Sequence, residues 1–157
     1  MKRALIAAAI LMVFTSLVLL ADGPSKGMLG SWKLDPAKSK YSPGPAPKSQ
    51  MAKLEEAEGG LKVVSDRVDA EGKTTHFEYT AKLDGKDYPV KGDPGRDAVS
   101  VKKIDDYTLE ITNKKAGKVT TTIRAVYAKD WKSRTETATG TDNQGRKVEN
   151  VTQWTKQ

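Results

Sequence analysis

Short strand-like runs separated by turn signals fill this 157-residue sequence from residue 51 to its end. The runs recur every ~8–12 residues, a spacing typical of all-β proteins. Between residues 74 and 83, for example, Thr75, Phe77 and Tyr79 alternate with polar residues, so one face of the run is suited to burial. Asp84-Gly85 then supplies a strong hairpin signal. The pattern predicts an antiparallel meander whose strands are joined by tight turns.

An open sheet of this size would expose two edges, whereas closure into a barrel removes them. Charged residues on the expected outer faces, such as Lys62, Glu78 and Lys118, argue against the apolar exterior of an outer-membrane barrel. We therefore predict an all-β, up-and-down antiparallel barrel of about 8–10 strands, wide enough for side chains or one small ligand. The expected strands span residues 30–34, 51–58, 61–68, 74–83, 86–90, 98–104, 107–113, 118–128, 131–139 and 146–156.

The first 21 residues differ in character from the rest, because Lys2 and Arg3 precede an apolar run that extends to Ala21. This layout is typical of an export signal. We expect residues 1–21 to be a cleaved signal peptide. A retained inner-membrane anchor is the alternative, since ~18 apolar residues can just span a bilayer. Either form predicts an exported protein, periplasmic or extracellular.

The remaining residues are expected to form one domain. Residues 22–29 are predicted to be a loose leader, and residues 30–157 the barrel. Residues 35–50 hold four of the seven prolines and are predicted to be a loop. One helical turn is conceivable at residues 36–40, with Asp35 as its N-cap and Pro36 at its first position.

Composition excludes several kinds of chemistry. The chain has no cysteine, so thiol nucleophiles, disulfides and Cys-based zinc sites are excluded, and its one histidine, His76, lies beside charged residues as a surface histidine would. The net charge of +7 falls to +5 without Lys2 and Arg3, and the basic residues are interleaved with acids, which is not typical of a nucleic-acid-binding protein. We expect no catalytic residue, metal or cofactor, and no nucleic-acid partner. The lysines near the prolines suggest a weak contact with an anionic envelope surface: Lys33, Lys38, Lys40 and Lys48.

Two arginines on neighbouring runs are candidates for ligand binding. Hydrophobic patterning of residues 118–128 favours Tyr127 and its alternate neighbours as the inner face, with Arg124 in solvent. In the alternative register, Arg124 points inward and pairs with an acidic group of a ligand. Arg134 shares its face with Lys132 and Glu136, which favours solvent. For either arginine, a buried ion pair with Glu136 or Glu149 is a further alternative.

Aromatic residues and threonines form a second candidate set. Their simplest role is core packing, and Trp32 is expected to plug one end of the barrel. Tyr79 and Tyr127 are expected to bring hydroxyl groups to the inner face, where Thr121, Thr135, Thr137 and Thr139 would join them. The predicted ligand-binding residues are Tyr79, Arg124, Tyr127 and Thr137.

The start of the expected barrel, Gly30-Ser31-Trp32, resembles the G-x-W start of the lipocalins and of the fatty-acid-binding proteins. Residues 30–157 also resemble a group of small exported bacterial proteins of uncharacterised function, through the segments GSWKLDPAKSKYSPG, LDGKDYPVKGDP, KKIDDYTLEIT, KKAGKVTTT and GTDNQGRKVENV. The resemblance implies a calycin-like barrel.

Together these features predict an exported, monomeric, lipocalin-like protein that binds a small amphipathic or anionic molecule inside its barrel without catalysis. The alternative is a structural or interaction module of the cell envelope, with a filled barrel and a binding surface made by its loops. An enzyme on a small barrel is a third class.

Overall fold

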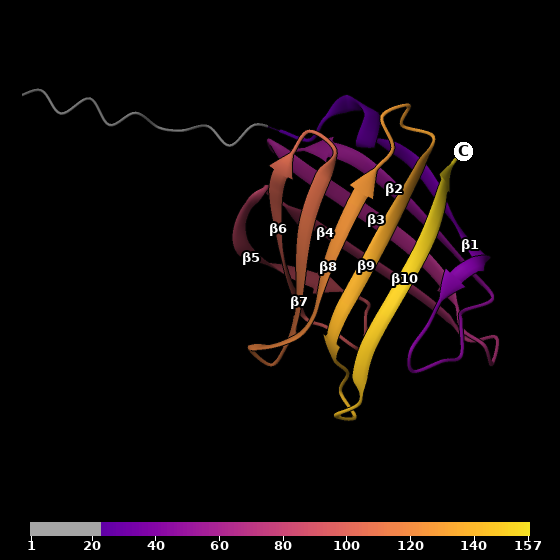
Figure 1. Ribbon diagram of the computed structural model, residues 1–157. Helices are drawn as coiled ribbons and strands as arrows, with labels where there is room; N and C mark the ends of the chain where they lie inside the picture. The colour runs from indigo at the N-terminus through magenta and orange to yellow at the C-terminus, as the bar shows by residue number, and fades with distance from the viewer. Residues whose placement is uncertain (1–22) are drawn as a thin grey trace, which may run out of the picture.

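A computed structural model describes residues 23–157, whose ten strands form a closed antiparallel barrel (Figure 1). Each strand pairs with its neighbours in sequence, and β1 pairs with β10 to close the barrel. The predicted all-β, up-and-down barrel is therefore confirmed. The strands are β1 (Gly30–Lys40), β2 (Ser49–Ala57), β3 (Gly60–Val68), β4 (Thr74–Ala81), β5 (Asp84–Lys91), β6 (Ala98–Asp105), β7 (Thr108–Lys115), β8 (Lys118–Tyr127), β9 (Ser133–Thr141) and β10 (Lys147–Lys156).

One end of the barrel is closed by packed aromatic side chains. Trp32 of β1 is fully buried, and its indole N–H donates a hydrogen bond to the Met28 carbonyl at 2.9 Å. Met28 is itself fully buried in a 3-10 turn, η1 (Lys26–Met28), so the segment expected to be a loose leader packs onto this end. The Tyr127 ring meets the Trp32 ring edge-on at 5.3 Å. These contacts pack the side chains tightly at this end of the barrel.

A second aromatic layer lies on the outside of the closed end. Tyr107 and Trp131 stack with ring centroids 4.6 Å apart. Gly27 lies against the Trp131 ring, and a Cβ added at Gly27 would overlap that ring. Glycine is therefore required here to let the backbone approach an aromatic face closely.

The first strand extends further than predicted. Residues 36–40 continue β1 instead of forming a helical turn, and the pairing of β1 with β10 shifts register between Asp35 and Lys40. The Asp35 carboxylate accepts a hydrogen bond from the Lys38 amide at 3.3 Å, and the Ser39 hydroxyl donates to the Asp35 carbonyl at 2.6 Å. These local bonds satisfy the bulged backbone, so the irregular link between β1 and β2 covers only residues 41–48.

The seam between β4 and β5 is the thinnest part of the wall. Only two residue pairs join these strands, Glu78 with Lys91 and Tyr79 with Val90, whereas nine pairs join β2 and β3. A groove of about 210 Å³ lies over the seam. The other seams carry at least four residue pairs each, some with register shifts, and together they close the barrel wall.

Within residues 23–157, no helix is long and apolar enough to cross a membrane. The predicted signal segment, residues 1–21, lies outside the described residues.

Candidate functional site

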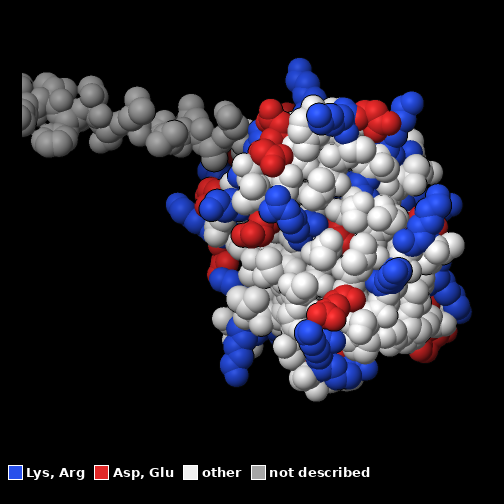
Figure 2. Space-filling model, viewed as in Figure 1, with Lys and Arg blue, Asp and Glu red and all other residues white. Residues whose placement is uncertain are grey.

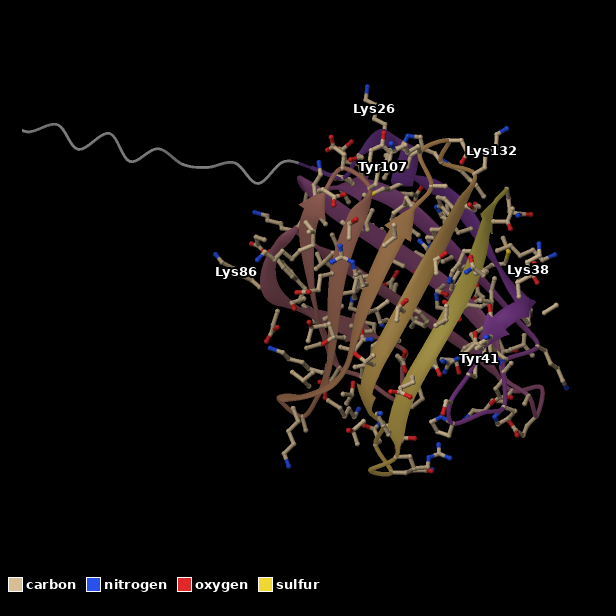
Figure 3. All side chains as sticks on the ribbon, in the orientation of Figure 1. Lys26, Lys38, Tyr41, Lys86, Tyr107 and Lys132 are labelled. Carbon is tan, nitrogen blue, oxygen red and sulfur yellow. The ribbon has the colours of Figure 1, made fainter. Side chains whose placement is uncertain are left out.

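The barrel encloses a cavity of about 470 Å³, within the ~300–1,000 Å³ that small-molecule sites usually occupy. The end opposite Trp32 carries the loops that surround its mouth: residues 41–48 between β1 and β2, 92–97 between β5 and β6, and 142–146 between β9 and β10. Figure 3 shows Tyr41 near this end and Tyr107 at the closed end. The cavity is therefore a pocket with one floor and one mouth.

The cavity walls follow from the two-residue period of the strands. Side chains at alternate positions point to the same face of a strand. On β3 this row begins with Leu61 and Val63 and continues through Ser65 to Arg67 toward the mouth. The walls are mixed: apolar side chains come from Ala52, Val63, Phe77, Ile111 and Ile123, and neutral polar ones from Gln50, Ser65, Asn113 and Thr121.

Arg134 of β9 forms part of the cavity floor. Its guanidinium donates a hydrogen bond to the Tyr127 hydroxyl at 3.0 Å and forms an ion pair with the Glu136 carboxylate at 3.0 Å. It also lies over the rings of Trp154, at 4.7 Å, and Trp32, at 5.1 Å. Buried charges are tolerated when paired and hydrogen-bonded in this way.

The electrostatics of the floor follow from this pairing. Burial alone would lower the pKa of Arg134, but the charge of Glu136 and the contact with Tyr127 outweigh burial and raise it. Arg134 is therefore a permanent cation, neutralised by Glu136. Its Nε–H is buried and has no hydrogen-bond partner in the described structure.

Two tyrosines present hydroxyl groups to the cavity. Burial raises the pKa of Tyr79 to about 12, against the smaller opposing effect of the Arg96 charge. Burial together with the charge of Glu136 raises the pKa of Tyr41 to about 12. Both are therefore neutral at physiological pH and can donate a hydrogen bond. Among the described residues, no group hydrogen-bonds the Tyr79 hydroxyl, so this donor is available to a ligand or to water.

At the mouth, the loop between β5 and β6 turns Arg96 inward. The Arg96 guanidinium pairs with Asp93 at 3.0 Å and donates to the Asn113 side-chain oxygen at 2.6 Å. It also lies 4.3 Å from the centre of the Phe77 ring. The amide of Asn143 donates to the Gly95 carbonyl at 3.2 Å, which ties the β9–β10 loop to this one. The mouth is thus narrowed by loops bonded to one another.

The structure divides the predicted ligand-binding residues into two groups. Tyr79 lines the cavity, and Tyr127 is buried beneath it, bonded to Arg134. Arg124 and Thr137 face each other across the β8–β9 pairing on the outer wall, where both are exposed. The patterning that placed Arg124 in solvent therefore agrees with its position, and the inward alternative does not.

The face chosen for residues 133–141 needs a correction. Thr135, Thr137 and Thr139 were expected to point inward, but Arg134, Glu136 and Ala138 are the residues that line the cavity. The physical reason is the ion pair, since a charged face can be buried when its charges neutralise each other. Of the two readings for Arg134, the buried pair with Glu136 is the one that the structure shows.

Sequence reasoning missed two arginines of the site. The position of Arg67 could have been predicted, because it lies on the same strand face as Leu61, at every second residue along β3. The position of Arg96 could not, because it lies in a Gly- and Pro-containing turn and its partner Asn113 is on another strand.

His76 lies outside the cavity, in an exposed pair with Asp66 at 2.7 Å. Across residues 23–157, no group of three or more His, Cys, Asp or Glu side chains is arranged to hold a metal ion. Neither a scan of protein-family models nor a search of curated proteins finds a match for the chain.

Proposed function

We propose that this protein is an exported, lipocalin-like carrier or receptor that binds one small amphipathic molecule inside its barrel and performs no chemistry on it. The observation that carries the proposal is the cavity of about 470 Å³ inside a closed barrel. Ligand sites are concave and combine apolar surface with placed polar groups. The mixed walls of this cavity supply both, with a larger polar share than most such sites have. The amino-terminal pattern of residues 1–21 supports export.

The amphipathic character of the ligand follows from how the walls are divided. Phe77, Ile111 and Ile123 offer an apolar surface that water solvates poorly. The Tyr79 hydroxyl adds a neutral donor that no described residue hydrogen-bonds. A wholly polar ligand would leave the apolar walls unused, and a wholly apolar one would leave the polar groups without bonds.

The competing function is an envelope module that has a filled barrel and interacts through its loops. The enclosed volume argues against it, because a purely structural barrel is expected to be packed by side chains. On the face displayed in Figure 2, basic and acidic side chains are interleaved and form no single charged stripe. That arrangement gives this face no distinctive charge with which to select a partner.

The test is native mass spectrometry of the protein purified from its exported compartment, followed by organic extraction of whatever it holds. A stoichiometric extra mass is expected. The matched pair of variants is Ala138→Phe, which adds a ring inside the cavity, and Thr137→Phe, which adds the same ring on the outer wall. Ala138→Phe should lose the extra mass and Thr137→Phe should keep it.

A bare mass in all three proteins, unchanged after incubation with lipid and metabolite mixtures, would contradict ligand binding and favour the envelope module. Equal loss of the extra mass in both variants would also contradict binding inside the barrel.

A further inference from the structure

We infer that the cavity ligand is a singly charged anionic amphiphile, whose head group binds Arg67 at the mouth and whose tail extends inward past Phe77. This inference rests on the proposed binding function and adds to it the charge of the ligand and its orientation.

The position of Arg67 is set by strand register. Arg67 lies on the inner face of β3, paired across the sheet with Gln50 of β2 on one side and Thr75 of β4 on the other. Its side chain is half-buried and lines the cavity. These three residues form the level of the wall nearest the mouth, so a group bound to Arg67 remains close to solvent.

One charged side chain of the cavity lining, Arg67, has no partner among the described residues. In the described part of the chain, the Arg67 guanidinium has neither an ion pair nor a hydrogen bond, although it lines the same cavity as several carboxylates. Each of the other charged side chains of the lining already has a partner at 3.0 Å or less: Arg96 with Asp93, Arg134 with Glu136, and Asp142 with Arg146. The lining holds three arginines and three carboxylates, but Asp142 is taken by Arg146, which lies outside the lining. Arg67 is therefore the guanidinium left for an anion with one charge, and a cation placed beside it would be repelled.

The surroundings of Arg67 favour an oxyanion. Tyr41 lies within electrostatic range of Arg67, and its hydroxyl is protonated at neutral pH. Gln50 faces Arg67 across the strand pair, with its amide nitrogen bonded to the Ser65 hydroxyl at 3.0 Å. A planar guanidinium binds a carboxylate, sulfate or phosphate monoester through two parallel hydrogen bonds. Two neighbouring neutral donors would strengthen such a site without adding charge.

The cavity wall deeper than Arg67 suits the apolar tail of the ligand. One level deeper, the register places Ala52, Ser65 and Phe77 side by side, and the next level holds Leu54, Val63 and Tyr79. The wall therefore becomes more apolar with depth on these three strands. Among the described residues that line the floor, the charged ones are Arg134 and Glu136, which neutralise each other. Two donors of the deep part have no partner in the described structure: the Tyr79 hydroxyl, which is neutral, and the Nε–H of Arg134, whose charge is already balanced by Glu136. The charged end of the ligand therefore belongs at the mouth, beside Arg67, which none of the described residues pairs.

The experiment compares three probes with identical tails: dodecanoate, dodecan-1-ol and dodecyltrimethylammonium. The exported protein is first freed of bound material on a hydrophobic resin. The two charged probes are then titrated by calorimetry below their micellar concentrations, and dodecan-1-ol below its solubility limit. Wild type should bind dodecanoate at least about tenfold more tightly than dodecanol, as a charge-assisted hydrogen bond allows. Dodecyltrimethylammonium should bind most weakly.

Two variants locate the charge effect. Arg67→Gln should weaken dodecanoate binding about tenfold or more, because the charge-assisted bonds are lost, and leave dodecanol binding unchanged. Arg124→Gln removes an exposed arginine from the outer wall and should change neither affinity. Arg67→Lys keeps the charge without the planar fork and should retain part of the preference for dodecanoate, provided that circular dichroism shows the barrel intact.

The outcomes separate the two proposals. If wild type and Arg67→Gln bind dodecanoate and dodecanol equally, binding in the cavity stands and the anionic head group at Arg67 is overturned. If Arg124→Gln loses the preference instead, the site lies on the outer wall and the inference is also overturned. If none of the probes binds wild type, the inference falls together with the proposed binding of amphiphiles.

Discussion

The two ends of the cavity hold arginines in opposite states. At the floor, Arg134 is enclosed by aromatic rings and neutralised by Glu136. At the mouth, Arg67 is half-buried and has no partner in the described structure. The comparison separates two uses of one residue type. A buried charge whose partner is built into the fold is part of the structure and is costly to unpair, whereas a charge left without a partner is available to a ligand.

The largest effect is expected from breaking the floor pair. Glu136→Gln leaves the Arg134 guanidinium buried without a counter-charge, which should lower the free energy of unfolding by about 3 kcal/mol. Urea denaturation measures this free energy of unfolding. The matched control is Glu149→Gln, which breaks an exposed pair with Lys147 and should change stability by less than ~1 kcal/mol. Similar losses in the two variants would show that the floor pair is no more structural than a surface one.

A second effect is expected at alkaline pH. The pKa of Tyr79 is about 12 in the folded protein and ~10 when unfolded, so the unfolded chain releases this proton first as pH rises. The contribution of Tyr79 to the free energy of unfolding should therefore be fully present below pH ~10. It should be lost, by on the order of 2–3 kcal/mol, as the pH rises through 12. Denaturation midpoints measured from pH 8 to pH 12 provide the test, and Tyr79→Phe should show a shallower decline. If stability fell equally steeply with pH in Tyr79→Phe, the loss would have to come from other titrating groups.

The smallest effect is expected at the mouth. In the empty protein, Arg67→Gln removes a charge that has no partner in the described structure, so the free energy of unfolding should change by less than ~0.5 kcal/mol. With saturating dodecanoate, wild type should gain more stability than Arg67→Gln, because tighter binding to the folded state stabilises it more. Thermal unfolding with and without dodecanoate measures both quantities. A large loss in the empty protein would mean that Arg67 is structural, like Arg134.

Sequence reasoning was strongest where the cause of structure is local. Alternation in segments such as residues 74–81 acts between near neighbours, and it predicted the strands of the meander. Burial of Trp32 likewise follows from a strand with one apolar face. The hairpin signal at Asp84-Gly85 was wrong in its position, because these residues begin β5 and only two residue pairs, far from them, join β4 to β5.

The face of β9 was assigned incorrectly because its determinants are distant in the sequence. Arg134 and Glu136 make their strand face resemble a solvated one, and only the rings of Trp32 and Trp154, contributed by other strands, show that the pair is enclosed. Arg96 depends in the same way on Asn113, which is 17 residues away. Arg67 differs, since counting every second residue from Leu61 reaches it.

The most direct test of a ligand inside the barrel is methyl NMR of the protein titrated with dodecanoate. Residues 23–157 contain three isoleucines: Ile111 and Ile123 line the cavity, and Ile104 is exposed on the outer wall as an internal control. Binding in the cavity predicts saturable shifts of the Ile111 and Ile123 methyl signals while Ile104 stays fixed. Unchanged signals from the two cavity methyls, or a shift confined to Ile104, would contradict the account.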